Sequence, residues 1–122
     1  MSSPESPYRI LFTSDARDEV ASLDGSIKKR LKGVLTNKLA RDPEGYRTPL
    51  RSPLAGFWKH EFASHRVIYR IYPDKAILVV CAVGKRQSEH ASDVYKQLEP
   101  MVKAGKIAEQ IMAAMQNVKS KP

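Results

Sequence analysis

One apolar stretch decides the fold: Ala76-Ile77-Leu78-Val79-Val80-Cys81-Ala82-Val83. Successive side chains of a strand point to opposite faces of the sheet, and every position here is apolar. The stretch therefore predicts a central strand that is covered on both faces. The alternation places Cys81 and Val83 on one face, and Val80 and Ala82 on the other. Cys81 lies in the middle of the stretch, and we interpret it as a packed core residue rather than a nucleophile.

The residues before this strand predict a β-hairpin. Strands are expected at 57–62 and 66–72, joined by a tight turn at Ala63-Ser64-His65, and Pro73-Asp74-Lys75 forms the next turn. Residues 8–12, which are rich in aromatic and branched side chains, predict a fourth strand at the start of the chain.

Two helices are expected between the first strand and the hairpin. Ser14 or Asp15 is the predicted cap of one helix, and Ser26 that of a second helix, which runs to about Arg41. The prolines and glycine of residues 42–55 predict a connecting loop without regular structure.

The chain ends with further helical sequence. A helix is expected from about Ser88 to Leu98, an interruption at Pro100, and an amphipathic helix at 101–118. The order predicts an α+β fold, in which two N-terminal helices pack on a curved, mainly antiparallel four-stranded sheet. We expect a domain at 1–98 and an added C-terminal helical extension at 99–122, which docks on the chain's own body.

Composition places this chain among ordinary soluble proteins of one domain. It has 122 residues, 42% of them hydrophobic and 28% charged. No apolar run is long enough for a membrane span, and residues 1–7 lack the pattern of a signal peptide. A single cysteine, Cys81, fits a reducing compartment. We therefore expect a cytoplasmic protein that has no membrane partner.

The formal net charge of +8 favours polyanions or an acidic protein as partners. Basic residues are concentrated between Lys28 and Arg51, which predicts one basic face. We expect the second helix to present to nucleic acid a row of exposed cations: Lys28, Lys29, Arg30 and Lys32.

Common catalytic motifs are absent from the sequence. The three histidines, His60, His65 and His90, are far apart and show no ligand spacing, so neither a metal nor another cofactor is predicted.

A different set of side chains is expected to meet at one end of the sheet. Lys59 and Glu61 share a strand face, Arg66 starts the paired strand, and Lys85 and Arg86 leave the central strand. The following segment holds the last two members of the set, His90 and Tyr95. RNA cleavage without a metal needs such cations, together with a base for the 2′-hydroxyl and an acid for the leaving oxygen. The alternative is a group of solvated strand-end charges.

Several short motifs resemble the RelE/YoeB toxins of the RelE/ParE superfamily. The matching segments are Pro49-Leu50, Leu54-Ala55-Gly56-Phe57-Trp58, His65-Arg66-Val67-Ile68-Tyr69, Val83-Gly84-Lys85-Arg86 and Asp93-Val94-Tyr95. The resemblance covers about residues 8–98. It implies a metal-free ribonuclease-like fold and a toxin that a cognate antitoxin protein neutralises.

The resemblance also implies roles for individual residues. Arg66 and Arg86 would hold the scissile phosphate, Tyr95 would position or stack on a base, and Lys59 would support the phosphate or assist proton transfer. Lys85 would add to RNA binding. Trp58 is more readily a core residue than a stacking platform, and His65 a support for the hairpin turn.

The chain departs from the family pattern in several places: the His-Tyr pair that ends the central strand of YoeB is absent, and the gap from Arg86 to Tyr95 is longer than in RelE. Glu61 replaces a lysine of many RelE proteins, and Thr48 replaces a catalytic glutamate of YoeB-like members. The general base is therefore open among His90, Glu61 and Lys59, and a neutral imidazole is the readiest base at pH 7.

Three functions are compatible with this sequence. The first is an endoribonuclease that cleaves mRNA on the ribosome and inhibits translation. The second is a ParE-type inhibitor of DNA gyrase, which has no chemical need for the predicted cation set. The third is an inactive relative retained for binding. In each case we expect an acidic, partly helical antitoxin segment to bind across the molecule.

Overall fold

A computed structural model describes residues 7–46, 48–50, 54–85 and 94–119. One five-stranded sheet has the order β1-β5-β4-β3-β2, and only the β1–β5 pairing is parallel. The strand bounds are β1 Arg9–Phe12, β2 Thr48–Pro49, β3 Trp58–Phe62, β4 His65–Tyr72 and β5 Ile77–Lys85. The mainly antiparallel sheet was expected, whereas β2 was not, since it lies inside the predicted loop. Pro49 is tolerated there because β2 is an edge strand.

The two predicted N-terminal helices are present, although each begins at a different cap from the one expected. The bounds are α1 Ser14–Ala21 and α2 Gly25–Val34, and a π-helical turn, η1 Leu35–Leu39, follows α2 directly. Thr13 caps α1 by accepting a hydrogen bond from the Ala16 backbone, and Asp24 caps α2 by accepting one from Ser26. A short 3-10 turn, η2 Pro73–Lys75, joins β4 to β5.

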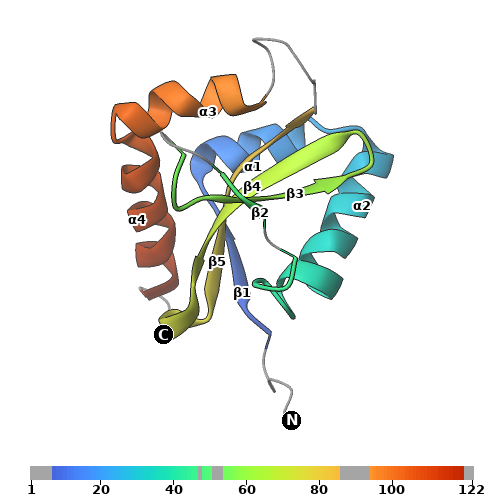
Figure 1. The fold of residues 1–122 in the computed structure, drawn as a ribbon, viewed down its shortest axis with the longest axis horizontal. Helices are drawn as coiled ribbons and strands as arrows, with labels where there is room; N and C mark the ends of the chain where they lie inside the picture. The colour runs from blue at the N-terminus through green and yellow to red at the C-terminus, as the bar shows by residue number, and fades with distance from the viewer. Residues whose placement is uncertain (1–6, 47, 51–53, 86–93, 120–122) are drawn as a thin grey trace.

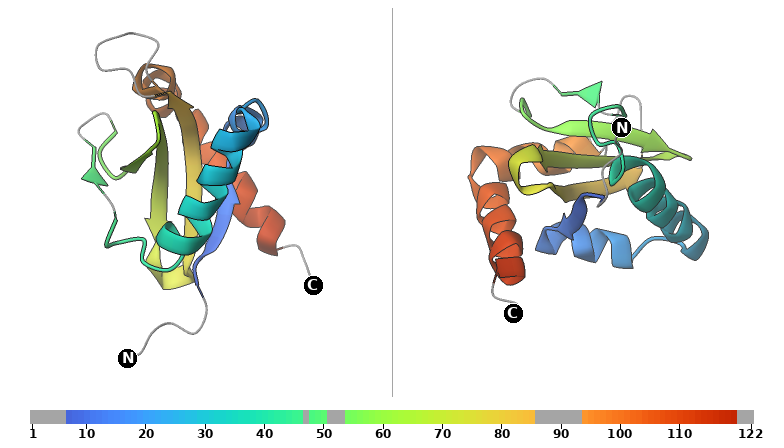
Figure 2. Two further views of the ribbon diagram at one scale, coloured as in Figure 1. Left: turned by 90° about the vertical axis from the view of Figure 1, so that its right-hand side faces the viewer. Right: turned by 90° about the horizontal axis from the view of Figure 1, so that it is seen from below.

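Helices lie on both faces of the sheet, and each face has its own apolar core. One core joins α1, α2 and η1 to the sheet through residues such as Leu31, Leu35 and Tyr69. The other joins the sheet to α3 Val94–Lys103 and α4 Lys106–Lys119, with Ile68 and Ile107 among its members. Figure 1 shows α2 and α4 on opposite sides of the sheet, and Figure 2 shows how strongly the sheet twists between them. The α+β fold with an added C-terminal helix is as predicted.

β5 is buried on both faces, as expected, but its alternation changes once. The pairing with β4 shifts between Ile68 and Tyr69, which leaves Cys81 as an extra residue on β5. Cys81 and Ala82 consequently both face the α4 core, while Val83 faces the α2 core. The prediction that Cys81 and Val83 share a face was therefore wrong, because a β-bulge reverses the face to which later side chains point.

Beyond the end of β1, Thr13 and Glu19 contact the backbone of β5 on that edge. The Thr13 hydroxyl donates a hydrogen bond of 3.4 Å to the Cys81 carbonyl. The Val83 amide donates one of 2.8 Å to Oε1 of Glu19. Burial raises the pKa of the Glu19 carboxyl, although this hydrogen bond acts in the opposite direction. Beyond the end of β1, side chains of the α1 region thus fix this edge of β5, while β4 pairs with its other edge.

The C-terminal helices break at a different residue from the one predicted. Pro100 lies inside α3, and the chain turns at Gly105, whose φ of +78° is easily adopted only by glycine. Leu98 and Met101, on either side of Pro100, pack in the α4 core, and their burial offsets the missing hydrogen bond. The predicted helix start at Ser88 lies outside the described residues.

α4 docks on the chain's own body, as expected. Ile107 and Ile111 are buried, and Gln110 exchanges two hydrogen bonds of 3.1 and 3.2 Å with Asp15 at the start of α1. The division into 1–98 and 99–122 stays a prediction, and α3 continues across residue 98. Within the described part of the chain, no helix has the length and apolarity that crossing a bilayer requires.

Candidate functional site

A short hairpin brings three of the predicted site residues together. Lys59 and Glu61 lie on β3, and Glu61 is paired in register with Arg66 on β4. The turn between the strands comprises only Ala63 and Ser64, because His65 already belongs to β4, and Ala63 adopts a φ of 51°. The predicted three-residue turn is therefore shorter by one residue.

Glu61 forms ion pairs with both cations. Its Oε2 lies 3.0 Å from Nη2 of Arg66 and 3.5 Å from Nζ of Lys59. The Arg66 side chain is only 9% exposed, against 24% for Lys59 and 36% for Glu61. A buried guanidinium whose charge is balanced by a carboxylate is held in a defined orientation. This group can therefore offer fixed donors to an anion and, next to them, a proton acceptor.

The two described histidines, His60 and His65, make contacts other than those of the Lys59, Glu61 and Arg66 group. His65 is buried, and its Nδ1 lies 3.4 Å from the Ser64 hydroxyl, so it supports the turn as expected. Burial and the nearby Lys85 ammonium lower the pKa of His65. The His60 ring contacts Tyr46 edge-on at 5.7 Å, and its pKa is also lowered by burial. Among the described side chains, no three potential metal ligands gather.

Two further residues are core residues, as the sequence predicted. Cys81 is 1% exposed, and burial raises the pKa of its thiol to about 12, which makes a thiolate nucleophile unavailable near neutral pH. Trp58 is partly buried against the core on the α2 side.

Three predicted site residues are not placed by this structure. Arg86 and His90 lie outside the described residues, and Tyr95 belongs to α3 but its side chain is not described. Lys85 is the exposed last residue of β5 and pairs in register with His65.

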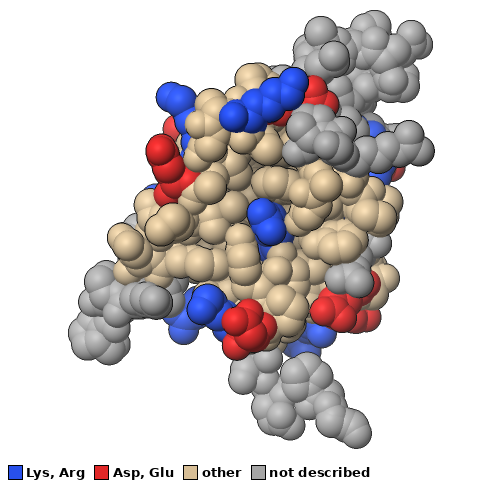
Figure 3. Space-filling view, turned by 60° about the vertical axis from the view of Figure 1, so that its left-hand side comes forward, with Lys and Arg blue, Asp and Glu red and all other residues tan. Residues whose placement is uncertain are grey.

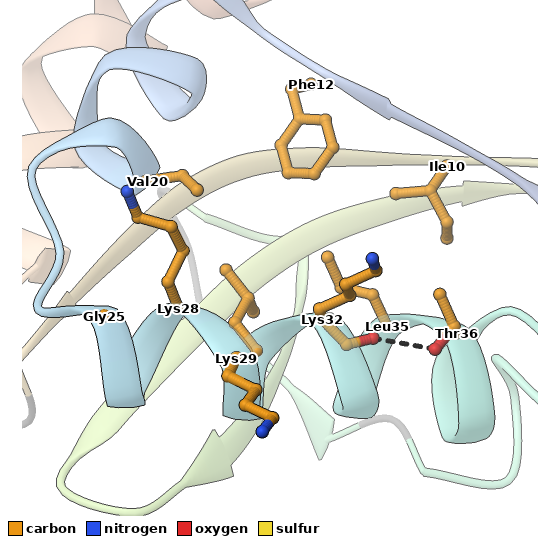
Figure 4. A pocket seen from close by; sticks show the side chains of 10 residues that line it. Ile10, Phe12, Val20, Gly25, Lys28, Lys29, Lys32, Leu35 and Thr36 are labelled. Atoms are coloured by element: carbon orange, nitrogen blue, oxygen red, sulfur yellow. Dashed lines mark hydrogen bonds between the residues drawn. The ribbon is translucent and has the colours of Figure 1, made fainter.

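The basic row of α2 lies on the other side of the sheet from Arg66. Its side chains are exposed, and Lys28, Lys29 and Lys32 border a groove of about 550 Å³ between α1, α2 and β1. The groove has an apolar lining, to which the following residues contribute: Ile10, Phe12, Val20, Leu31 and Leu35. In Figure 4 the Lys28 ammonium lies beside Val20 of α1, and its Nζ donates a hydrogen bond of 3.4 Å to the Ala21 carbonyl. Arg30 is exposed on the same helix but does not line this groove.

Charges are distributed differently on the side of α4. Figure 3 shows lysines and arginines there as separate groups, with uncharged surface between them and acidic residues near the margin. Any anion site on this side therefore depends on individual, well-placed cations rather than on a broad basic surface.

The sequence analysis missed Arg70, a second arginine on the same strand face as Arg66. Its guanidinium carbon lies 5.1 Å from the centre of the Phe57 ring and 5.7 Å from that of the Tyr72 ring. The spacing of two that relates Arg66, Ile68 and Arg70 was a sufficient signal to include it.

Comparisons with known proteins agree with this fold and with the toxin resemblance. Residues 10–90 match the family model of the ParE toxin of the type II toxin-antitoxin system parDE. Toxin RelG of Mycobacterium tuberculosis is 29% identical over 91 residues, which cover 75% of this chain and 99% of that protein.

Two solved structures are similar to the whole domain. The toxin–antitoxin complex RelBE2 of Mycobacterium tuberculosis contains a chain with a TM-score of 0.63 and 28% identity, over 70% of this chain and 98% of that one. The isolated RelE toxin of E. coli shares the fold, with a TM-score of 0.56 and 20% identity, over 78% of this chain and 98% of that chain.

Fold and matches together define a small toxin with helices on both faces of a mainly antiparallel sheet. The chain belongs to the ParE toxin family of type II toxin–antitoxin systems, within the RelE/ParE superfamily.

Proposed function

We propose that this toxin is a metal-independent endoribonuclease that cleaves mRNA on the ribosome and thereby inhibits translation. The observation that supports this proposal best is the buried Arg66 guanidinium, held 3.0 Å from the Glu61 carboxylate near the turn of the β3–β4 hairpin. Such a pair joins a phosphate-binding fork to a proton acceptor, and an inhibitor that acts only by binding does not need that combination.

In the proposed reaction, the 2′-oxygen forms a bond to the adjacent phosphorus while the bond from phosphorus to the 5′-oxygen breaks. Arg66 binds the phosphate, and Lys59 supports its developing charge. Of the two described candidates for the base, Glu61 is the proton acceptor, since a carboxylate offers acceptor oxygens and lysine is a hydrogen-bond donor. Glu61 therefore takes the proton of the 2′-hydroxyl.

The remaining roles belong to residues that the resemblance supplies. Arg86 is the second phosphate-binding arginine, and Tyr95 stacks on a base. His90, as an imidazolium, donates the proton that the departing 5′-oxygen needs.

Inducing the protein in cells and mapping RNA ends tests this function. Cuts inside translated messages are expected. DNA damage with intact mRNA would instead identify a gyrase inhibitor. If neither occurs while an antitoxin still binds, the chain is an inactive relative.

A second experiment separates chemistry from RNA attraction. Single-turnover cleavage is compared for Arg86→Ala and Lys29→Ala. We expect Arg86→Ala to slow cleavage about a hundredfold or more at saturating RNA, the usual effect of losing one donor to a developing oxyanion. Lys29→Ala should weaken binding slightly and leave the saturated rate unchanged. A parental rate for Arg86→Ala would remove Arg86 from the mechanism.

We also propose that the protein acts in the cytoplasm and is neutralised by an acidic antitoxin segment. The RelBE2 structure of Mycobacterium tuberculosis is itself a toxin–antitoxin complex. In this chain the groove between α1, α2 and β1 combines an apolar lining with bordering lysines. That combination suits an amphipathic helix whose polar face is acidic.

A further inference from the structure

We infer that Arg70 binds a phosphate of the RNA strand next to the scissile phosphate. This inference rests on the proposed ribonuclease function and extends its substrate contacts by one subsite. Arg70 lies on β4 and is half-buried. The proposed cleavage reaction gives it no role.

The pairing register places Arg70 in line with the candidate catalytic cations. Glu61 is opposite Arg66 and Lys59 is opposite Ile68, so Arg70 lies diagonally across from Lys59. Same-face positions along a strand are separated by about 7 Å. Arg66, Lys59 and Arg70 therefore occupy three successive rows of one sheet face, a spacing that suits neighbouring phosphates of an extended strand.

Two aromatic rings orient the guanidinium. Phe57 is buried, and its ring centre lies 5.1 Å from the guanidinium carbon, while the Tyr72 ring lies at 5.7 Å. Stacking on rings stabilises a cation without using its N–H groups. Both rings therefore lie at cation–π distance from Arg70, and these contacts use none of its N–H donors.

The charge of Arg70 is not balanced by a carboxylate within the described part of the chain. No described side chain forms a salt bridge with it, and its buried Nε has no hydrogen-bond partner there. An arginine kept only for packing would normally have its buried donors satisfied, because leaving a buried donor without a partner is destabilising. An oriented guanidinium with free donors is instead a site for an anion.

Phosphate is the anion that fits these observations. The planar fork of arginine donates two parallel hydrogen bonds to a phosphate. Ile68, between the two arginines on β4, is buried, so an RNA strand would reach Arg70 by passing over Lys59 on β3, which lies on the same face of the sheet. We expect Arg70 to contribute to RNA affinity and not to the bond-breaking step.

The test compares Arg70→Gln and Arg70→Lys with the parent protein in two assays. Fluorescence anisotropy measures binding of a short single-stranded RNA whose 2′-hydroxyls are all methylated, over a series of salt concentrations. Single-turnover cleavage of unmodified RNA, with ribosomes where needed, gives the half-saturating concentration and the saturated rate. Lys75→Gln, which removes an exposed lysine at the turn after β4, is the control.

For Arg70→Gln we expect binding about tenfold weaker, and a saturated rate within about twofold of the parent rate. The slope of log affinity against log salt should fall in magnitude by about 0.7, the change for one lost contact to a single strand. Arg70→Lys should restore the slope but only part of the affinity, and Lys75→Gln should match the parent.

Unchanged affinity and slope for Arg70→Gln would overturn the inference. So would a lower saturated rate with an unchanged salt slope, because this pattern indicates a purely structural role. A parent protein that binds the methylated RNA through Arg70 but never cleaves RNA would refute the proposed function and leave the subsite standing.

Discussion

At the scale of residues, the register of the β3–β4 hairpin determines which side chain Arg66 and Glu61 each contact. Both are ordinary polar residues of a hairpin, yet the register places them opposite each other and closes a 3.0 Å ion pair. Because the guanidinium is buried and the carboxylate is more exposed, the cation is fixed and the acceptor can still meet a substrate.

Replacing Glu61 by Gln removes the proposed base and keeps the size of the side chain. We expect the saturated cleavage rate to fall about a hundredfold or more, which is the usual contribution of a general base. Single-turnover assays measure the rate, and Glu44→Gln, an exposed acid in the loop before β2, is the control. A parental rate with tighter RNA binding would mean that Glu61 only balances the charge of Arg66.

Cys81 should be chemically silent in the folded protein. Burial raises the pKa of its thiol to about 12, so the thiolate is scarce at pH 8 and becomes abundant only when pH approaches that value or when the chain unfolds. Iodoacetamide at pH 8 is expected to leave Cys81 unmodified until denaturant is added, as mass spectrometry can follow. Rapid labelling of the native protein would contradict this burial.

At the scale of elements, the strongly patterned segments could be predicted from the sequence and the irregular ones could not. The doubly apolar pattern identified β5, and aromatic and branched runs identified the other long strands. No local signal marks the bulge at Cys81, because all residues around it are apolar and fit either face. β2 was hidden for a related reason, since its two residues form a strand only through pairing with β3.

Pro100 shows that a proline in the sequence does not always mark the end of a helix. Tertiary burial of Leu98 and Met101 keeps α3 continuous through the proline, and the left-handed backbone at Gly105 separates α3 from α4 instead. In the candidate site, Lys59, Glu61 and Arg66 followed from strand alternation. Arg70 was missed because alternation was not extended along β4.

Removing the chain after Pro100, which deletes α4 together with the last three residues of α3, tests the structural role of this C-terminal segment. Ile107 and Ile111 lose their burial, which is worth about 1.5–3 kcal/mol for each side chain, and the cores beneath become exposed. We expect a marked fall in the denaturant midpoint and a tendency to self-associate. Chemical denaturation and light scattering measure both effects. A shortened chain as stable and monodisperse as the parent would show that α4 is dispensable.

At the scale of the whole molecule, the two candidate binding surfaces lie on opposite faces of the sheet. The groove with its lysines belongs to the α2 face, and the pair of Glu61 and Arg66 does not border it. Binding of an antitoxin in the groove and cleavage of RNA should therefore be separable by substitution.

Val20→Asp places a carboxylate in the apolar lining of the groove. We expect antitoxin affinity to fall at least tenfold, because the new charge is desolvated and repels an acidic partner. Toxicity should then persist when the antitoxin is co-expressed, and RNA cleavage by the purified toxin should be unchanged. Asn37→Ala, exposed in η1 and outside the groove, is the control. Normal neutralisation of Val20→Asp would place the antitoxin elsewhere.

The pairing of β1 with β5 determines when the sheet can form during synthesis of the chain. Thr13 and Cys81, which meet where β1 ends, are 68 residues apart in the chain. At a synthesis rate of about 5–20 residues per second, β1 leaves the ribosome roughly 3 to 14 seconds before its partner strand exists. Until β5 has been synthesised, β4 lacks one of its two neighbouring strands, and the sheet around Arg66 is incomplete. The candidate site therefore cannot assemble until most of the chain has been synthesised, so the nascent toxin passes through several seconds in which it cannot act.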